Sequence, residues 1–123
     1  MNTDYRHSNV TERIIGAAYT VYNALGRGFL EKVYENALAV QMRGDGLRVV
    51  QQHPIRVTYA GQVVGEYVAD LLVDGKVIVE VKACSGLDGA AEAQLINYLK
   101  ATGIKVGLLI NFGPEIEVRR RVF

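Results

Sequence analysis

Two neighbouring apolar segments of the sequence carry ionisable residues where a buried β-strand ordinarily has none. The first covers residues 67–73 and contains Asp70, and the second covers residues 76–82 and contains Glu80 and Lys82. A charged side chain inside a hydrophobic sheet costs several kcal/mol unless it is paired or bound to a metal. The pattern therefore predicts a β-hairpin with an acid on each arm, and we interpret the two acids as a site for a divalent metal.

The length of the turn between these segments decides whether the two acids can meet. A two-residue loop at Asp74-Gly75 places Asp70 and Glu80 on opposite faces of the hairpin, which rules out a shared metal. A three-residue loop or a β-bulge places both acids on one face, within reach of one ion. Lys82 shares a face with Glu80 because the two lie two apart in a strand. We therefore predict a connection of odd length, although Asp-Gly alone favours two residues.

Hydrophobic periodicity divides the chain into elements with the order α-α-β-β-β-α-β-β. Asn9 and Glu12 have the spacing of a capping box, and Pro54 predicts a bend or a sheet edge because it cannot donate a hydrogen bond. Alternating charged and apolar residues at the C-terminus predict an exposed edge strand. The predicted helices cover residues 10–25, 29–43 and 88–101, and the predicted strands cover residues 47–59 with a bend at 53–54, 63–73, 76–82, 105–112 and 115–123.

Length and composition limit the class of protein. A chain of 123 residues fits a single domain, residues 1–123, with one core. The formal net charge of +1 argues against strong nonspecific affinity for DNA. No apolar run reaches about 18 residues and the N-terminus lacks an apolar signal segment, so we expect a cytoplasmic protein without membrane contact. Cys84 is the single cysteine, which excludes an internal disulfide and a multi-cysteine zinc site.

A set of ordered segments resembles a known family. The segment from Gly28 to Tyr34, GFLEKVY, is similar to the signature of the GxxExxY protein family, which is placed in the PD-(D/E)XK nuclease superfamily. The supporting segments are YVAD at 67–70, EVK at 80–82, QLINYL at 94–99 and LINFG at 109–113. The resemblance covers about residues 10 to 122 and implies a single α/β domain of the restriction-endonuclease type, with a mixed central sheet flanked by helices.

The resemblance also implies a role for individual residues at the metal. Asp70 and Glu80 correspond to the metal-binding carboxylates, and the backbone carbonyl of Val81 is a further expected ligand. Lys82 corresponds to the residue that orients and helps to deprotonate the attacking water. Glu31 corresponds to the additional acid of the superfamily's first motif.

Further implied residues lie outside the metal centre. Gln94 and Tyr98 match the fourth motif, which lines the pocket or contacts the substrate, and they share a helix face because they lie four apart. Ala69 stands where the superfamily name has Pro, a change that removes no ligand. The expected cofactor is Mg²⁺ or Mn²⁺, since Mg²⁺ prefers oxygen ligands and keeps several waters.

Simpler interpretations exist for several of these residues. Glu80 and Lys82 can form an ion pair on a solvated face of the sheet. Glu31 can stabilise the first turn of its helix, where an acid is favourable in any protein. Tyr34 is interpreted as core packing with a hydrogen-bonded hydroxyl in place of a direct catalytic role.

The leading hypothesis is a nuclease that hydrolyses phosphodiester bonds of DNA or RNA with a divalent metal. The alternative is a noncatalytic nucleic-acid-binding or scaffold protein that retains the nuclease fold. A metal-dependent hydrolase of a smaller phosphate compound is a third possibility. The modest charge and small size favour a substrate supplied by a partner, or a homodimer that combines two grooves.

Overall fold

The structure, a computed structural model, describes residues 6–123. Its elements follow one another in the predicted order. They are the helices α1 Ser8–Leu25, α2 Glu31–Gly44 and α3 Gly89–Thr102, and the strands β1 Val49–Tyr59, β2 Gln62–Val73, β3 Val77–Lys82, β4 Val106–Phe112 and β5 Ile116–Val122. Residues 1–5, part of the N-terminal stretch expected to lack a signal segment, lie outside the described residues.

The strands form one five-stranded sheet in the order β1-β2-β3-β4-β5. Strands β3 and β4 are parallel and the other neighbours are antiparallel, so the predicted mixed sheet is confirmed. Parallel neighbours need a crossover, and α3 supplies it between β3 and β4. The C-terminal strand β5 is an edge of the sheet, as its alternating sequence predicts.

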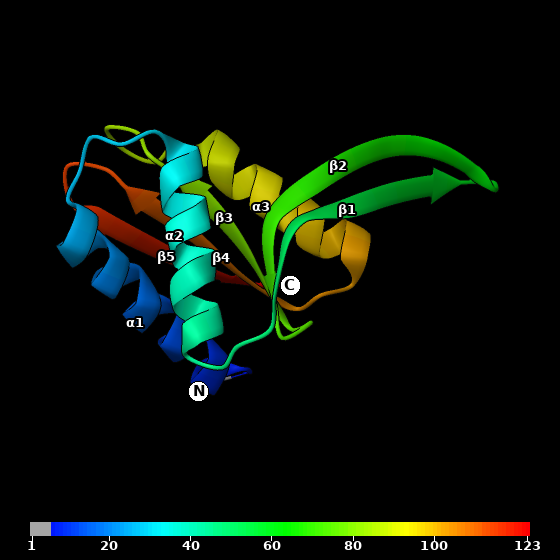
Figure 1. Ribbon diagram of the computed structural model, residues 1–123. Coiled ribbons are helices and arrows are strands. Elements are labelled where there is room, and N and C mark those ends of the chain that lie inside the picture. Colours follow the sequence, from blue (N-terminus) through cyan, green and yellow to red (C-terminus); the bar gives the residue numbers. More distant parts are fainter. Residues whose placement is uncertain (1–5) are drawn as a thin grey trace, which may run out of the picture.

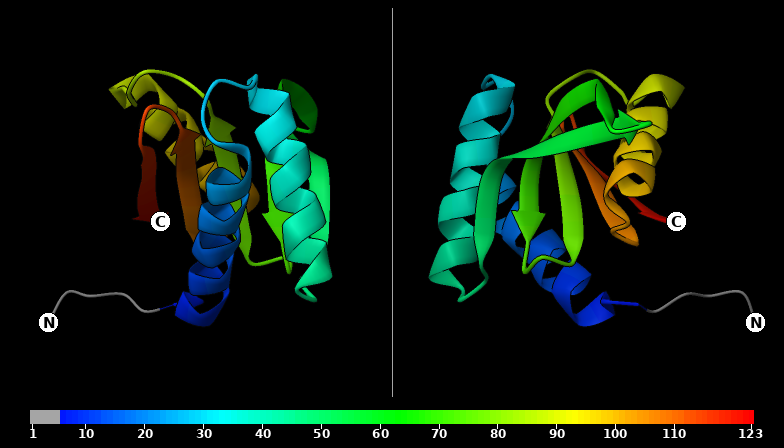
Figure 2. Two further views of the ribbon diagram at one scale, coloured as in Figure 1. Left: turned by 60° about the vertical axis from the view of Figure 1, so that its left-hand side comes forward. Right: turned by 90° about the vertical axis from the view of Figure 1, so that its right-hand side faces the viewer.

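The helices cover both faces of the sheet, which gives three layers (Figure 2). Helices α1 and α2 pack on one face, where Leu71 and Val79 belong to the larger core. Helix α3 packs on the other face against Ile78 and Leu109. Strands β3 and β4 are buried along nearly their whole length because helices lie on both sides of them.

Strands β1 and β2 continue beyond the rest of the sheet as a curved arm, residues 53–69 (Figure 1). Strand β2 pairs with β3 only at residues 71–73, whereas its pairing with β1 extends to the hairpin end. At the base of the arm Gln52 has a left-handed φ of 55°. The bend therefore lies one residue before the predicted site. Pro54 remains inside β1, opposite Val68, and is tolerated there because β1 is the predicted sheet edge.

The predicted capping box at the start of α1 is wrong. Helix α1 begins at Ser8, its N-cap is His7, and no side chain caps it. Asn9 lies inside the helix, so its side chain is past the position from which it can accept the cap hydrogen bonds. None of the helices in the described part of the chain is long and apolar enough to cross a membrane.

Candidate active site

The turn between β2 and β3 has three residues, 74–76, because Val73 pairs with Val77 and Leu71 with Val79. The predicted connection of odd length is therefore confirmed. Asp74 and Gly75 both adopt left-handed φ angles, 52° and 64°. The same register places Asp70 and Glu80, the next pair away from the turn, opposite each other.

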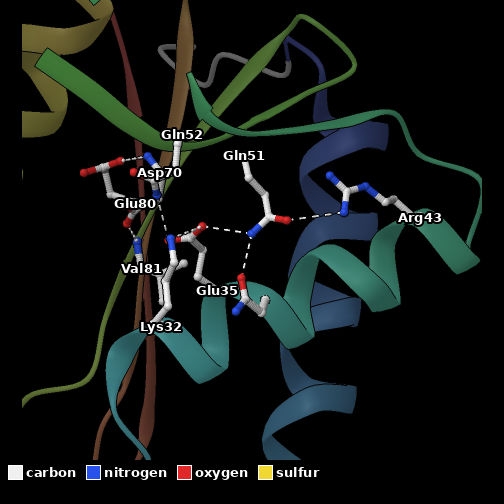
Figure 3. Close-up of polar contacts among 9 residues, drawn as sticks. Lys32, Glu35, Arg43, Gln51, Gln52, Asp70, Glu80 and Val81 are labelled. Atoms are coloured by element: carbon white, nitrogen blue, oxygen red, sulfur yellow. Dashed lines mark hydrogen bonds and ion pairs between the residues drawn. The ribbon is translucent and has the colours of Figure 1, made fainter. Parts of the chain in front are cut away.

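The two acids replace the backbone ladder at the point where it stops (Figure 3). The Asp70 N–H donates to Glu80 Oε2 at 2.7 Å, and the Val81 N–H donates to Asp70 Oδ2 at 2.8 Å. Each carboxylate thus holds the backbone of the opposite strand through one oxygen. Within residues 6–123, no hydrogen bond is made to Asp70 Oδ1 or Glu80 Oε1, and neither is a buried atom without a partner, so both oxygens meet solvent.

Burial strongly disfavours the charged form of these acids. Only 4% of the Glu80 surface is exposed, and burial raises the pKa of its carboxyl to about 8, with a further contribution from the nearby Asp70 carboxylate. Burial also raises the pKa of Asp70, and the hydrogen bond from Val81 opposes that rise. Buried neighbouring carboxylates repel each other, and a cation between them relieves the repulsion.

Glu31 lies at the start of α2, beside the hairpin acids. Burial raises the pKa of Glu31, the charge of Lys82 opposes this rise and the charge of Asp70 adds to it. These electrostatic interactions place the side chain near both residues. Glu31 also occupies the first turn of α2, so the simple helix-stabilising role holds alongside the proximity to the site.

Tyr34 fixes the start of α2 and so the position of Glu31. Its ring is fully buried and stacks on Phe112 with ring centroids 4.6 Å apart. Its hydroxyl donates to the Gly26 carbonyl at 2.6 Å and accepts from the Phe29 N–H at 3.3 Å. The interpretation of Tyr34 as core packing with a hydrogen-bonded hydroxyl is confirmed. Because these bonds order the loop before the helix, α2 begins at Glu31 and not at residue 29 as predicted.

Lys82 ends β3 and lines a pocket of about 370 Å³ together with Gln94 from α3. Within the described chain, Lys82 makes no ion pair with Glu80, so the alternative of a solvated pair is not observed. The loop that follows is held by Asn111, which accepts from the Cys84 N–H at 2.9 Å and donates to the Cys84 carbonyl at 3.0 Å.

Tyr98 lies one helical turn from Gln94 and within electrostatic range of the acids. Its side chain is 5% exposed, and its pKa is raised by burial and by the charges of Glu80 and Asp70. Helix α3 therefore brings Gln94 to the Lys82 pocket and Tyr98 to the carboxylates. The substrate roles of both residues stay predictions. The same holds for the Val81 carbonyl, since only the N–H of Val81 has an observed role.

A buried network on α2, not predicted from the sequence, supports the site (Figure 3). Glu35 is 3% exposed and accepts from Gln51 Nε2 at 3.0 Å and from Gln52 Nε2 at 2.9 Å. Lys32 Nζ forms an ion pair with it at 3.2 Å. The signal in the sequence is that Glu35 follows Glu31 by four residues and so shares its helix face.

The donor set fits a hard divalent cation that keeps part of its water shell. In the described chain, no three His, Cys, Asp or Glu side chains form a complete ligand cluster. Two carboxylates with one solvent-reachable oxygen each leave several coordination positions for water and substrate, as Mg²⁺ prefers. These oxygens are hard donors, which suit Mg²⁺ and Mn²⁺ better than softer metals.

Two solved structures are similar to this chain. The crystal structure of SSO0001 is similar with a TM-score of 0.57 and 20% identity over 96% of this chain. The match spans 59% of the length of SSO0001. The crystal structure of an alkaline exonuclease, LHK-Exo from Laribacter hongkongensis, has a TM-score of 0.49 and 13% identity, covering 91% of this chain and 81% of the exonuclease. No curated protein has a matching sequence.

The family comparison is more specific. The model that describes the PD-(D/E)XK nuclease superfamily matches residues 8–122, nearly the whole chain. The match includes every residue of the site, from Glu31 on α2 to Tyr98 on α3. The chain therefore belongs to the PD-(D/E)XK nuclease superfamily.

Proposed function

We propose that this protein is a nuclease that hydrolyses phosphodiester bonds of DNA or RNA with Mg²⁺ or Mn²⁺. One observation carries the proposal. The half-buried Asp70 and the buried Glu80 bring carboxylates from neighbouring strands together, and each keeps one oxygen open to solvent at the point where the ladder stops. Nucleases of this superfamily generally use divalent metals, which supports the same site.

The open oxygens of Asp70 and Glu80, with the Val81 carbonyl, would hold the ion. Bound there, a divalent cation supplies Lewis acidity that lowers the pKa of water and offsets charge on the phosphoryl oxygens. The cost of burying two carboxylates is then offset by the ion. The raised pKa of Glu80, about 8, predicts that protons compete with the metal at neutral pH.

The remaining residues act on water and substrate. The Lys82 ammonium supplies hydrogen-bond donors and positive charge beside the acids, where it can orient the attacking water and stabilise the developing negative charge. Glu31 adds a carboxylate that can accept a hydrogen bond from water or help to hold the cation. Gln94 and Tyr98 offer an amide and a hydroxyl for contacts with the substrate backbone.

The proposal is tested in two steps. Calorimetric titration of Mn²⁺ into the protein measures whether the site binds a cation. Cleavage of labelled single-stranded, duplex and branched DNA and RNA then measures activity. Lys82→Ala should lose most cleavage, and the matched control Lys76→Ala, in the turn of the same hairpin, should keep it.

Two results would contradict the proposal. The first is the absence of heat from the wild type at millimolar Mn²⁺. The second is a wild type as inert as Lys82→Ala while both proteins bind nucleic acid. That second result supports the noncatalytic nucleic-acid-binding alternative.

A further inference from the structure

The aromatic ring of Tyr67 lies beside the site, and none of the roles described above uses this ring. It lies on β2 at the base of the arm and is 41% exposed. The Tyr67 ring lies against Gly65, which has no side chain. A Cβ added at Gly65 would lie 3.2 Å from the ring. Its other neighbour is the Tyr98 ring, with centroids 5.8 Å apart and planes tilted by 45°. The ring is therefore held from two directions while a large part of it stays open to solvent.

The same ring lies one side chain away from the metal-binding acids. Tyr98, its ring neighbour, is electrostatically coupled to Glu80, Asp70 and Tyr67 together. The strand twists at Gln52, which has a φ of 55°. Beyond this twist, Ile55 and Ala69 pack with Tyr98 in the core on the α3 face of the sheet. Tyr67 lies two residues before Ala69, on the same side of β2, which explains why it reaches α3.

Groups of different chemistry follow one another along α3. Gln94 lines the pocket with Lys82, and Tyr98, one turn later, contacts Tyr67. Lys82 and Tyr98 both interact electrostatically with Asp70 and Glu80, so the lysine and the aromatic pair both lie near the acids. A polynucleotide likewise carries anionic phosphates and flat bases, which a lysine and an open aromatic ring can each bind.

A nucleobase is the ligand that best fits an open, fixed aromatic ring in such a place. Base stacking on an aromatic side chain is tolerant of sequence and is available only when the base is not already stacked in a duplex. A ring held in place before binding loses little entropy on binding. We propose that Tyr67 stacks an unpaired base next to the scissile phosphate, so that the substrate is single-stranded nucleic acid or a frayed strand end. This inference rests on the proposed nuclease function.

Fluorescence anisotropy measures the binding of labelled single-stranded DNA and RNA in the presence of Ca²⁺. This measurement tests the proposal without depending on cleavage. Tyr67→Ala and Tyr67→Leu should each weaken binding about tenfold, because both lack a flat ring. Tyr67→Phe should bind within about twofold of the wild type, since stacking needs the ring and not the hydroxyl. Tyr59→Ala is the matched control, because Tyr59 is a 76%-exposed tyrosine at the far end of β1, and it should leave binding unchanged.

A second measurement asks whether Tyr67 contacts a base and not merely the backbone. One base of the oligonucleotide is replaced by an abasic residue, and the replacement is moved along the strand. For the wild type, one position should cost about tenfold in affinity. For Tyr67→Ala, the same position should cost nothing more, because the two changes remove the same contact.

The outcomes separate this inference from the proposed function. Absence of single-strand binding by the wild type, equal binding by Tyr67→Ala, or additive effects of the two changes would overturn the stacking role. A change in self-association of Tyr67→Ala with unchanged oligonucleotide binding would overturn it in favour of an interface between copies. Cleavage that depends on Lys82 but not on Tyr67 leaves the nuclease proposal intact, and stacking without any cleavage refutes the nuclease proposal alone.

Discussion

The β2–β3 hairpin has two halves that differ in what joins the strands. Next to the turn, residues 71–73 and 77–79 form a regular ladder of apolar residues, all of them buried except the half-buried Leu72. One residue further along, Asp70 and Glu80 bond to the backbone of the opposite strand through their carboxylates. The paired half gains from burial of apolar surface, whereas the open half pays a desolvation cost and gains two oxygens that can bind a ligand. The boundary shows how two carboxylates can accept the backbone N–H groups of the opposite strands at the point where the ladder ends.

The largest expected effect is on catalysis, from loss of one charge in the open half. Asp70→Asn keeps an oxygen that can accept from the Val81 N–H but removes the negative charge. We expect the cleavage rate to fall on the order of 1,000-fold and Mn²⁺ binding to be lost, while the unfolding midpoint stays close to that of the wild type. Cleavage assays and calorimetry measure both effects.

The control is Asp74→Asn, a change of the same chemistry in the turn of the same hairpin. It should leave metal binding and cleavage unchanged. Retention of Mn²⁺ binding by Asp70→Asn would show that the open half does not hold the ion.

The next effect is on stability, in the paired half. Leu71→Ala removes a fully buried side chain from the larger core and should lower the free energy of unfolding by about 3 kcal/mol. The Mn²⁺ affinity of the folded protein should not change, because Leu71 is buried in the larger core and points to the opposite face of the sheet from Asp70. Urea unfolding gives the stability. Val68→Ala, at a position 46% exposed on the same strand, should cost less than about 0.5 kcal/mol. An equal loss of stability in the two variants would contradict the conclusion that burial of apolar side chains stabilises the paired half.

A smaller effect of the opposite sign is expected from Glu80→Gln in metal-free buffer. The pKa of Glu80 in the folded protein, about 8, lies above the ordinary value of 4.5, so the folded state holds the proton more tightly. The free energy of unfolding therefore falls as the pH rises from about 4.5 to about 8 and then levels off. Glu80→Gln has no charge to bury, and at about pH 6 it should already be more stable than the wild type by about 2 kcal/mol, a difference that grows until about pH 8.

The measurement is urea unfolding of both proteins from pH 4 to pH 9 with EDTA present. The two curves should converge near pH 4. Glu66→Gln, which changes an exposed acid on the arm, should follow the wild type throughout. A constant difference between Glu80→Gln and the wild type at every pH would contradict the burial of charge at this position.

The smallest effect concerns the loop that positions Glu31. Tyr34→Phe removes the hydrogen bond to the Gly26 carbonyl and should lower the free energy of unfolding by about 1 kcal/mol. Cleavage should fall a few-fold, since the start of α2 is less firmly held. Tyr19→Phe alters an exposed tyrosine on α1 and should change neither quantity. Full activity together with unchanged stability in Tyr34→Phe would show that the hydrogen bond to the loop does not help to position Glu31.

The part of the site that depends on local pattern can be predicted from the sequence. The two acids interrupt apolar strands, and the alternation of side chains requires an odd-length turn for them to meet, which the pairing of Val73 with Val77 confirms. The edge strand β5 and the buried Tyr34 also follow from short-range patterns. These predictions succeed because each depends on residues close together in the chain.

The network around Glu35 could not be predicted in the same way. Its glutamine donors flank the left-handed backbone at Gln52, a conformation that non-glycine residues rarely adopt, and Pro54 signals a bend near this point but not which side chains the bend brings to Glu35. The link between Asn111 and Cys84 likewise joins residues 27 positions apart in the sequence. Both features arise only when the sheet has assembled, so they are consequences of tertiary structure.

The crossed hydrogen bonds of Asp70 and Glu80 give each acid a structural duty that an amide can also perform. Asn and Gln retain a carbonyl oxygen able to accept from the same N–H groups, so a doubly substituted protein, Asp70→Asn with Glu80→Gln, can close the hairpin without bearing charge. Such a protein would be an inert but correctly shaped trap. Used as bait, it would retain the nucleic acid that the proposed nuclease function predicts the wild type to cut and release.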